Sequence, residues 1–415
     1  MTNAPDALQS PAMLANFRMV RARTLGLTAP LSAEDCCAQS MPEASPVKWH
    51  LAHTTWFFET FVLAQFEPGF VVHHPAFRIL FNSYYNGVGD RHARAQRGML
   101  TRPSQAEVLD YRADIDVRIA ALLARQGRNA SEQASLAALV MLGLQHEQQH
   151  QELIMTDVMH LLSTNPLHPA YNAPARFERA LPVALPLRWH TFEAGVVSIG
   201  HAGDSFCFDN ETPCHRQFVE RFVLASRLVT NGEFRAFVDA GCYRNAALWL
   251  ADGWDWVCAN NVQQPLYWQH DVAQGWQEFT LRGLHALDAQ APVAHVCLYE
   301  ADAYARWAGA RLPSETEWEC AVADAAHGAL VQVDDSCWQW TSSSYAPYPG
   351  YAPVSGTLGE YNGKFMVNQY VLRGGSKVTA EGHSRRSYRN FFPASARWQF
   401  SGIRLARTLV DPVGD

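Results

Sequence analysis

The sequence has little of what marks secreted, membrane-bound or nucleic-acid-binding proteins. Its first residues, MTNAPDALQSPAML, contain no basic segment followed by a long apolar one, so they do not predict a signal peptide. No uncharged apolar run approaches the ~18 residues that cross a bilayer, and we expect no membrane partner. Lysine and arginine number 33 against 40 acidic residues, a formal net charge of −7, and they form no basic cluster. Nucleic acid is therefore not expected as a partner.

Cysteine follows no disulfide or zinc pattern. The nine cysteines are an odd number and are scattered along the chain, Cys36 and Cys37 are adjacent, and no CxxC motif occurs. In a large chain without a signal peptide, this distribution is typical of reduced thiols. We therefore expect a cytoplasmic protein.

What the sequence does have is the composition of a folded protein with an unusual supply of histidine. Its 415 residues are 48% hydrophobic and 18% charged, which is enough for two or three domains. Histidine reaches 17 and tryptophan 13. Such side chains can fill a core, but histidines grouped at ligand spacing indicate a metal site.

The first part of the chain, residues 10–165, has a helical pattern. Apolar residues recur every three or four positions and glycine is sparse. Ser104 and Glu107 have the spacing of a capping box at a helix start. The segment 66–103 is long and rich in aromatics, which predicts an ordered and functional connection. Four predicted helices suggest a bundle, and they are Asn16–Thr24, Val47–Phe66, Ser104–Gln126 and Glu132–Ser163.

The second part of the chain has a different texture. Prolines cluster in residues 166–189, which predicts a linker. From 190 to 410, short strand-like runs alternate with turn residues, which is typical of a loop-rich α+β domain. The expected strands are Thr191–Ile199 and Gln217–Ser226, and the expected helices are Asn231–Ala240 and Tyr299–Ala308.

The strongest chemical signal is the run His146-Glu147-Gln148-Gln149-His150 inside the last predicted helix. Positions i and i+4 face the same side of a helix, so both imidazoles can reach one ion. Asp157 and His160 continue this face. A face that is merely solvated or hydrogen-bonded is one alternative. A zinc peptidase is another, because it uses HExxH with the glutamate as general base, although Thr156 stands where the extended motif has its third ligand.

A third ligand is available on the second predicted helix. We prefer His53, which lies on the apolar side of that helix, and keep His50 as the alternative. Helical bundles commonly build metal sites from facing helices. Three neutral imidazoles suit Fe(II), Zn(II) or Cu(II). Because neutral ligands leave the charge of the ion unbalanced, such a site would favour a thiolate and O₂ as partners.

At this point two segments resemble a known family. WHLAHTTWFFE (49–59) and LQHEQQHQE (144–152) are similar to the metal half of the DinB-like bundle in ergothioneine-biosynthesis sulfoxide synthases. The second part carries LPSETEWE (312–319), WQWTSS (338–343) and LRGGS (372–376), in an order that resembles the formylglycine-generating-enzyme-like fold, which is related to C-type lectins. The resemblance implies a DinB-like four-helix bundle followed by this loop-rich domain.

The resemblance also implies a chemistry and a set of site residues. Non-haem Fe(II) would be held by His53, His146 and His150. Hercynine would be the acceptor, O₂ the oxidant, and a cysteine-type thiol the donor in ergothioneine biosynthesis. A related selenoneine synthase uses a selenosugar, and this stays an alternative. The implied hercynine contacts are Gln149, Asn390, Phe391 and Phe392.

Two further groups are expected to serve the donor and the chemistry. Tyr84 and Tyr85 form a pair that approaches the iron site in the family's cysteine-using subgroup, and one phenol could supply a proton. Arg91 and Arg94, with Arg97, could clamp a donor carboxylate. After LRGGS the chain has Lys377, where the family more often has Cys or Trp, and this departure bears on the donor.

Three other functions stay open at this stage. A formylglycine-generating activity needs a close cysteine pair late in the domain, but no cysteine follows Cys337. A DinB-like bundle can also serve as a metal-dependent thiol transferase that needs no O₂. The second domain could be a lectin-like binding module, since a fold does not fix a function. The oligomeric state is left unknown.

Overall fold

The computed structural model describes residues 10–171, 185–324, 329–353 and 357–409, and it divides the chain into two compact units. The first unit comprises Met1–Asn172 together with the short segment Gly356–Glu360. The second comprises Ala173–Ser355 and Tyr361–Asp415. Much of the expected linker, residues 172–184, lies outside the described residues.

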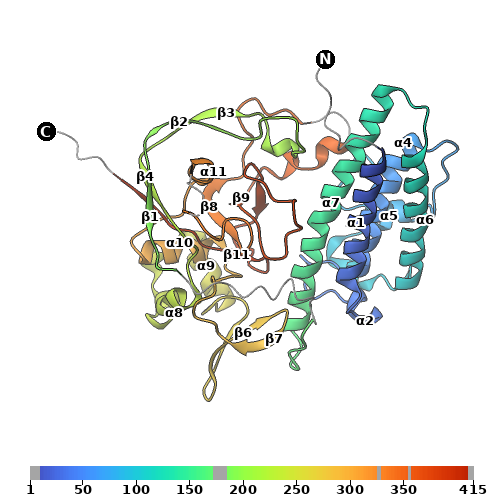
Figure 1. Cartoon of the computed structure of the whole chain (residues 1–415). Coiled ribbons are helices and arrows are strands. Elements are labelled where there is room, and N and C mark those ends of the chain that lie inside the picture. Colours follow the sequence, from blue (N-terminus) through green and yellow to red (C-terminus); the bar gives the residue numbers. More distant parts are fainter. Residues whose placement is uncertain (1–9, 172–184, 325–328, 354–356, 410–415) are drawn as a thin grey trace. The chain divides into compact units, whose positions relative to one another are not determined.

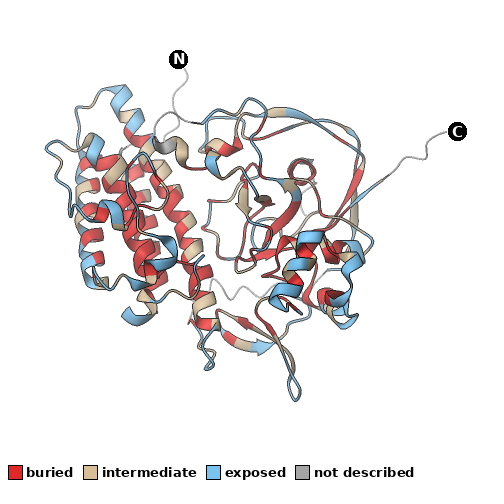
Figure 2. Cartoon of the chain, turned by 180° about the vertical axis from the view of Figure 1, so that it is seen from behind, coloured by how far each residue is buried: buried red, intermediate tan, exposed pale blue. Residues whose placement is uncertain are grey.

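The first unit is a helical bundle, as expected. Its helices α1, α6 and α7 run side by side (Figure 1), and α3 packs against both α6 and α7. On α1, α6 and α7 buried residues alternate with exposed ones, whereas every residue of α3 is buried (Figure 2). The bounds of the helices are α1 Ser10–Thr28, α2 Ala33–Cys37, α3 Val47–Phe57, α4 Ala64–Phe66, α5 Phe77–Leu80, α6 Gln105–Ala124 and α7 Ala130–Ser163.

Two helix starts follow their sequence signals. The predicted capping box at Ser104 and Glu107 is present, because the Ser104 hydroxyl accepts from the Glu107 N–H and the Glu107 carboxylate accepts from the Ser104 N–H. The same arrangement at Asn129 and Glu132 starts α7. Such caps satisfy backbone donors that the helix itself leaves unpaired.

One predicted helix is interrupted. The single helix expected over Val47–Phe66 is α3, followed by a π-helical segment at Phe58–Leu63 and the short α4. Within that segment the buried Glu59 carboxylate accepts from the Tyr111 hydroxyl and from the His73 N–H at 2.6 Å. A π-turn is common at functional positions in helices, and here it comes directly after the helix that carries His53.

The second unit is built from small sheets and short helices. Its sheets have the strand orders β1-β4-β12, β10-β9-β8-β11, β2-β3 and β5-β6-β7. The strand bounds are β1 Trp189–Phe192, β2 Gly195–Ile199, β3 His215–Val219, β4 Phe222–Ala225, β5 Trp268–Asp271, β6 Gly275–Thr280, β7 Gly283–Ala286, β8 Trp338–Ser344, β9 Tyr370–Arg373, β10 Asn390–Phe392, β11 Ser401–Gly402 and β12 Ala406–Thr408.

The two strands expected near the start of this unit are each divided into two. Thr191–Ile199 and Gln217–Ser226 form one antiparallel ribbon that is interrupted on both sides at the same level. Phe192 pairs with Phe222 before the interruption and Gly195 with Val219 after it, so the register is kept. Between these pairs the chain leaves the sheet of β1 and β4 and enters that of β2 and β3.

The helices of the second unit are partly as expected. The predictions at Asn231–Ala240 and Tyr299–Ala308 are confirmed as α8 and α10, whereas α9 and α11 were not predicted. Their bounds are α8 Asn231–Asp239, α9 Ala251–Asn260, α10 Leu298–Trp307 and α11 Glu315–Asp324. Both missed helices are short and carry tryptophan among polar residues, so the periodic apolar signal is weak.

Two expectations from composition can be compared with the structure. All nine cysteines lie in the described residues, and all are free thiols. Among the helices that the structure describes, none has the length and apolarity needed to cross a membrane.

Candidate metal centre and substrate sites

Three histidines meet inside the first unit. His53 comes from α3, and His146 and His150 come from α7. Each offers a ring nitrogen, and these nitrogens lie within 4.8 Å of one another. Nε2 of His53 and Nε2 of His146 are 3.2 Å apart. All three side chains are buried, so the structure brings together the three residues that the sequence proposes as ligands.

The local structure explains this convergence. One helical turn separates His146 from His150, and their ring centroids are 4.6 Å apart. His53 is held by a hydrogen bond of 2.6 Å between its Nδ1 and the carbonyl of Phe81, directly after α5. Since a carbonyl can only accept, Nδ1 donates and Nε2 keeps its lone pair. The Trp49 ring stacks on His53 with centroids 4.6 Å apart.

The electrostatics of these imidazoles favour metal binding. Burial lowers the pKa of His146 to about 3, and it lowers the pKa values of His53 and His150 well below their ordinary value. The rings are therefore neutral at pH 7, which is the form that coordinates metals. Without a metal, one proton on a ring nitrogen can bridge the His53–His146 contact, and with a metal both nitrogens can coordinate it. The donor set fits iron, zinc or copper, and it contains no carboxylate.

His50 lies behind this cluster rather than in it. Its Nδ1 is 2.8 Å from Nδ1 of His150, and its Nε2 is 3.0 Å from the Asp157 carboxylate. The His50–His150 contact uses one nitrogen of each ring, so His50 is a neighbour of a candidate ligand. The sequence showed Asp157 on the same helical face, but gave no sign of this contact.

Glu147, the acidic residue of the HExxH run, forms ion pairs with two buried arginines. It accepts from Arg112, from Arg21 at 2.9 Å, and from the Thr24 hydroxyl at 2.6 Å. Burial would raise its pKa, but Arg112 and Arg21 lower the pKa of Glu147 to about 2. A general base must be free to take a proton from water near the metal. This carboxylate points into an ion cluster instead, which argues against the peptidase interpretation.

The two tyrosines lie against an aromatic wall of the histidine cluster. Tyr85 is fully buried, and Tyr84 beside it is half-buried, with ring centroids 4.7 Å apart. The Trp56 ring is 5.5 Å from His53 and 5.8 Å from Tyr85. Likewise Phe57 lies 4.7 Å from His146 and 6.5 Å from Tyr85. The tyrosine loop and the histidines are therefore joined through two shared rings.

The loop that carries these tyrosines is held by side chains that the sequence did not single out. Asn82 donates to the carbonyls of Tyr85 and Gly89 at 3.0 and 3.1 Å, and its Oδ1 accepts from the Tyr85 N–H. Glu360, which belongs to the same unit, accepts from the N–H groups of Asn86 and Gly87. Asn in a loop is a familiar turn former, whereas Glu360 is distant in sequence and could not have been found.

The three arginines of the expected donor clamp differ in their surroundings. Arg91 and Arg94 are exposed, and Arg94 donates to the Glu43 carbonyl. Arg97 is buried, donates to the Ser45 hydroxyl at 2.8 Å, and lies 3.3 Å from the Trp49 ring centroid. Since Trp49 also stacks on His53, Arg97 is linked to the cluster through this one ring, and it was expected only together with Arg91 and Arg94.

The expected hercynine contacts fall in both units. Gln149 is half-buried on α7 of the first unit, between the two histidines in sequence. Asn390, Phe391 and Phe392 are half-buried and form β10 in the second unit. The Phe391 ring stacks on Tyr345 with centroids 4.1 Å apart. Phe392 has a looser contact, 6.2 Å from Trp398.

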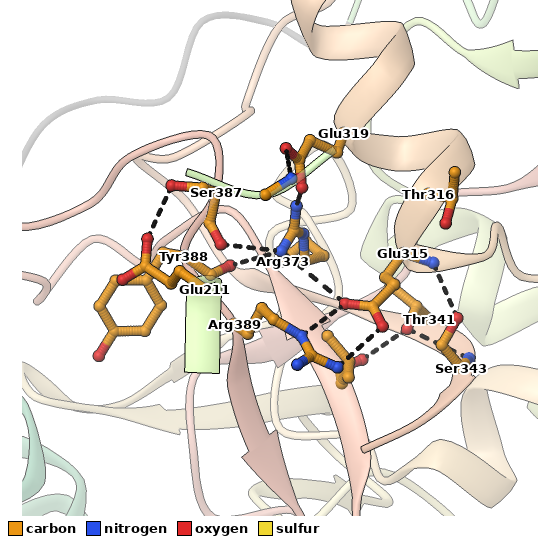
Figure 3. A network of polar contacts seen from close by, with 12 residues as sticks. Glu211, Glu315, Thr316, Glu319, Thr341, Ser343, Arg373, Ser387, Tyr388 and Arg389 are labelled. Atoms are coloured by element: carbon orange, nitrogen blue, oxygen red, sulfur yellow. Dashed lines mark hydrogen bonds and ion pairs between the residues drawn. The ribbon is translucent and has the colours of Figure 1, made fainter. Parts of the chain in front are cut away.

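A buried ion network fixes the chain directly before β10. Figure 3 shows Arg389 and Arg373 converging on Glu315, and Arg373 also reaching Glu319. Arg389 donates from Nε and Nη2 to the two oxygens of Glu315 at 2.8 and 3.0 Å. A bidentate pair of this kind sets the direction of the main chain as well as the position of the side chain. It therefore orients the strand that begins at Asn390.

Lys377, the departure noted in the sequence, lies on the surface of the second unit. Its side chain is exposed, with Nζ 5.1 Å from the Phe400 ring centroid. Its backbone N–H donates to the Ser336 carbonyl at 3.1 Å. These contacts are those of a surface lysine packed on an aromatic ring.

Comparisons with known proteins agree with this two-part architecture. Residues 16–154 match the DinB superfamily, and residues 190–335 match the sulfatase-modifying factor enzyme 1-like domain. A formylglycine-generating enzyme from Bos taurus is 29% identical over 36% of this chain and 42% of its own length. That likeness is confined to part of the chain, as expected for a shared domain.

Several relatives match nearly the whole chain. A hercynine oxygenase from Mycolicibacterium thermoresistibile is 31% identical, covering 88% of each chain. A hercynine oxygenase from Mycobacterium tuberculosis is 32% identical over 96% of this chain and 99% of that protein. Both domains are therefore shared in the same order, and the chain belongs to the hercynine oxygenase family.

Proposed function

We propose that this protein is a non-haem Fe(II), O₂-dependent enzyme that joins a sulfur donor to C2 of the imidazole of hercynine, in ergothioneine biosynthesis. The observation that carries the proposal is the buried cluster of three neutral imidazoles, His53, His146 and His150, in a chain with full-length relatives named hercynine oxygenase. The favoured donor is a cysteine-type thiol, either cysteine or γ-glutamylcysteine, and the product is a sulfoxide.

The overall reaction is balanced with O₂ as the oxidant. Hydrogen leaves imidazole C2 and the thiol, a carbon–sulfur bond forms, one oxygen atom goes to sulfur, and the other leaves as water. A ferrous ion held by the three histidines would supply O₂ activation and hold the reactants together. Everything else must come from the side chains of the protein.

The charge around the cluster suits anionic reactants. The three ligands are neutral, and Glu147 is neutralised by its arginines. Arg97 adds a buried positive charge next to Trp49. A thiolate and a carboxylate would therefore be attracted to this region. Arg94, and Arg91 beside it, are proposed as further contacts for a donor carboxylate.

The tyrosine pair is proposed to handle a proton. The hydroxyl of Tyr85 or Tyr84 would donate it as the carbon–sulfur bond forms. Trp56, Phe57 and Tyr85 are all buried, so bulk water does not compete with the Tyr85 phenol as the proton source. A phenol that donates a proton at this position would favour formation of the carbon–sulfur bond over oxidation of the thiol alone.

The residues proposed to contact the acceptor are Gln149 on α7 and Asn390, Phe391 and Phe392 on β10. Hercynine carries a quaternary ammonium group, which aromatic faces and oxygen acceptors bind well. Phe392 and Asn390 offer a half-exposed ring and an amide oxygen on β10, and Gln149 offers an amide on α7. Arg389 and Glu315 would keep β10 in place during binding.

The decisive experiment loads the purified protein with Fe(II) without oxygen and then admits air with hercynine and one donor. Cysteine, γ-glutamylcysteine and a selenosugar are tested separately, and the products are identified by mass spectrometry. A sulfoxide conjugate of hercynine supports the proposal. If only a selenium conjugate formed, the donor would be a selenosugar and not a thiol. If no donor caused oxygen uptake, the enzyme assignment would be wrong.

A matched pair of variants tests the metal site. His146→Ala should lose iron and turnover. His73→Ala is the control, because His73 is a partly exposed histidine of the same unit that pairs with Asp114 at 2.9 Å and lies outside the cluster. If His146→Ala were as active as His73→Ala, the histidine cluster would not take part in the reaction.

A further inference from the structure

A continuous line of buried polar groups runs from the main chain to the metal cluster. The Asp157 carboxylate oxygen Oδ2 accepts from the Ser45 N–H at 2.8 Å and lies 3.0 Å from His50 Nε2. His50 Nδ1 in turn lies 2.8 Å from His150 Nδ1. Ser45, His50, Asp157 and His150 are 4, 2, 6 and 8% exposed, so bulk water does not compete for these bonds.

The proton positions along this line depend on one another. A carboxylate can only accept, so His50 Nε2 must donate to Asp157. If His50 carries this single ring proton, its Nδ1 is an acceptor and His150 Nδ1 must donate to it. The other nitrogen of His150, Nε2, then keeps its lone pair. A second proton on His50 would reverse the last bond and place hydrogen on Nε2 of His150.

We propose that His50 and Asp157 are positioning residues that fix His150 in the Nδ1–H tautomer, with its Nε2 lone pair directed at the metal. This inference rests on the proposed metal centre. Hydrogen bonds to the outer nitrogen of a metal-bound imidazole hold the tautomer and the ring orientation. Here the carboxylate acts through a second imidazole, and the line continues to the backbone that precedes α3.

His53 shows the same design by a shorter route. Its Nδ1 donates directly to the carbonyl of Phe81, which fixes its tautomer with one bond. His150 has no backbone acceptor among its contacts in the described residues, so His50 serves in that role and itself needs Asp157 to hold its proton on Nε2.

Nuclear magnetic resonance of the metal-free wild-type protein tests the tautomer without any variant. With ¹⁵N-labelled histidine, two-bond ring couplings report which nitrogen carries hydrogen. We expect hydrogen on Nδ1 of His150 and on Nε2 of His50. Hydrogen on Nε2 of His150 would overturn the proposal.

Metal affinity provides the second readout, measured by competition with a chelator using Co(II) as the probe. Asp157→Leu removes the acceptor and should weaken binding by about 10–100-fold. Asp157→Asn keeps an oxygen that can accept at the same place and should bind Co(II) almost as tightly as wild type. The control is Asp114→Leu, at the more exposed His73–Asp114 pair, which should leave affinity unchanged. Equal affinity of folded Asp157→Leu and wild type would refute the role.

A further variant covers the case in which Asp157→Leu does not fold, since Ser45 also loses its acceptor. His50→Phe keeps a ring of similar shape but cannot accept from His150, and it should also lose about 10–100-fold in Co(II) affinity. Wild-type affinity in this variant would overturn the proposal. Failure of the metal centre itself is recognised separately, because His146→Ala would then bind Co(II) as well as wild type does.

Discussion

We predict that replacing Glu147 by glutamine lowers the free energy of unfolding and does not remove a catalytic group. Glu147 is fully buried, and both of its oxygens accept charge-assisted hydrogen bonds from arginines that are themselves buried. In Glu147→Gln the shape is kept, but Arg21 and Arg112 lose the carboxylate that balances them. Arg21 retains an ion pair of 2.6 Å with Asp116, so it keeps part of its charge compensation. Arg112 loses more of its compensation than Arg21 does.

The size of the effect follows from the pKa of Glu147. Burial would raise this pKa, but Arg112 and Arg21 outweigh it and lower the pKa from 4.5 to about 2. At about 1.4 kcal/mol for each pH unit between these values, the ionised carboxylate contributes about 3 kcal/mol to folding. Breaking one side of a buried ion pair costs about 3–5 kcal/mol, which is the same range.

Urea unfolding of the metal-free protein, followed by the circular dichroism of its helices, measures this loss. Because the folded pKa of Glu147 lies below the unfolded value, its contribution is complete above pH 4.5 and disappears as the pH falls toward 2. The difference in unfolding free energy between wild type and Glu147→Gln should therefore be about 3 kcal/mol at pH 7 and should shrink below pH 4.5.

The matched control is Glu67→Gln, which removes a carboxylate from a more exposed pair. Glu67 and Arg118 have side chains that are 22% and 18% exposed, so this change should cost less than about 1 kcal/mol. If Glu147→Gln were as stable as Glu67→Gln yet inactive, Glu147 would act in the chemistry and the interpretation of the ion cluster would be wrong.

Three further predictions concern the tyrosines, the second unit and the metal. Tyr85→Phe should divert the reaction from the sulfoxide toward oxidised thiol, measured by mass spectrometry; an unchanged product ratio would leave Tyr84, or neither, as the proton donor. Glu315→Gln should leave Arg389 without its carboxylate, lower the unfolding free energy by about 3–5 kcal/mol and weaken hercynine binding in calorimetry, whereas unchanged binding would separate this pair from the acceptor site. Co(II) at about 100 times its dissociation constant should stabilise the protein by about 2.7 kcal/mol, and stabilisation that persists in His146→Ala would contradict the metal site.

Most of the architecture could be predicted from local signals. The bundle helices can be recognised from the spacing of apolar residues and from a capping box such as that of Ser104. Both signals involve residues that lie only a few positions apart in the sequence. Two features could not be predicted in this way. They are the interruption of the helix after Phe57 and the division of the ribbon near Phe192, and both depend on partners that are distant in sequence. Glu59 is held by Tyr111, and β1 and β2 pair with different strands.

For the site, the sequence by itself determined the chemistry of the ligands. His146 and His150 are one helical turn apart in any α-helix, and a third histidine was available at position 53. Only the tertiary structure decided that His53 joins the cluster while His50 stands behind His150, and that Glu147 faces arginines rather than the cluster. The reason is physical: spacing along one helix fixes which side chains share a face, but the partners of that face come from other helices, and packing chooses them.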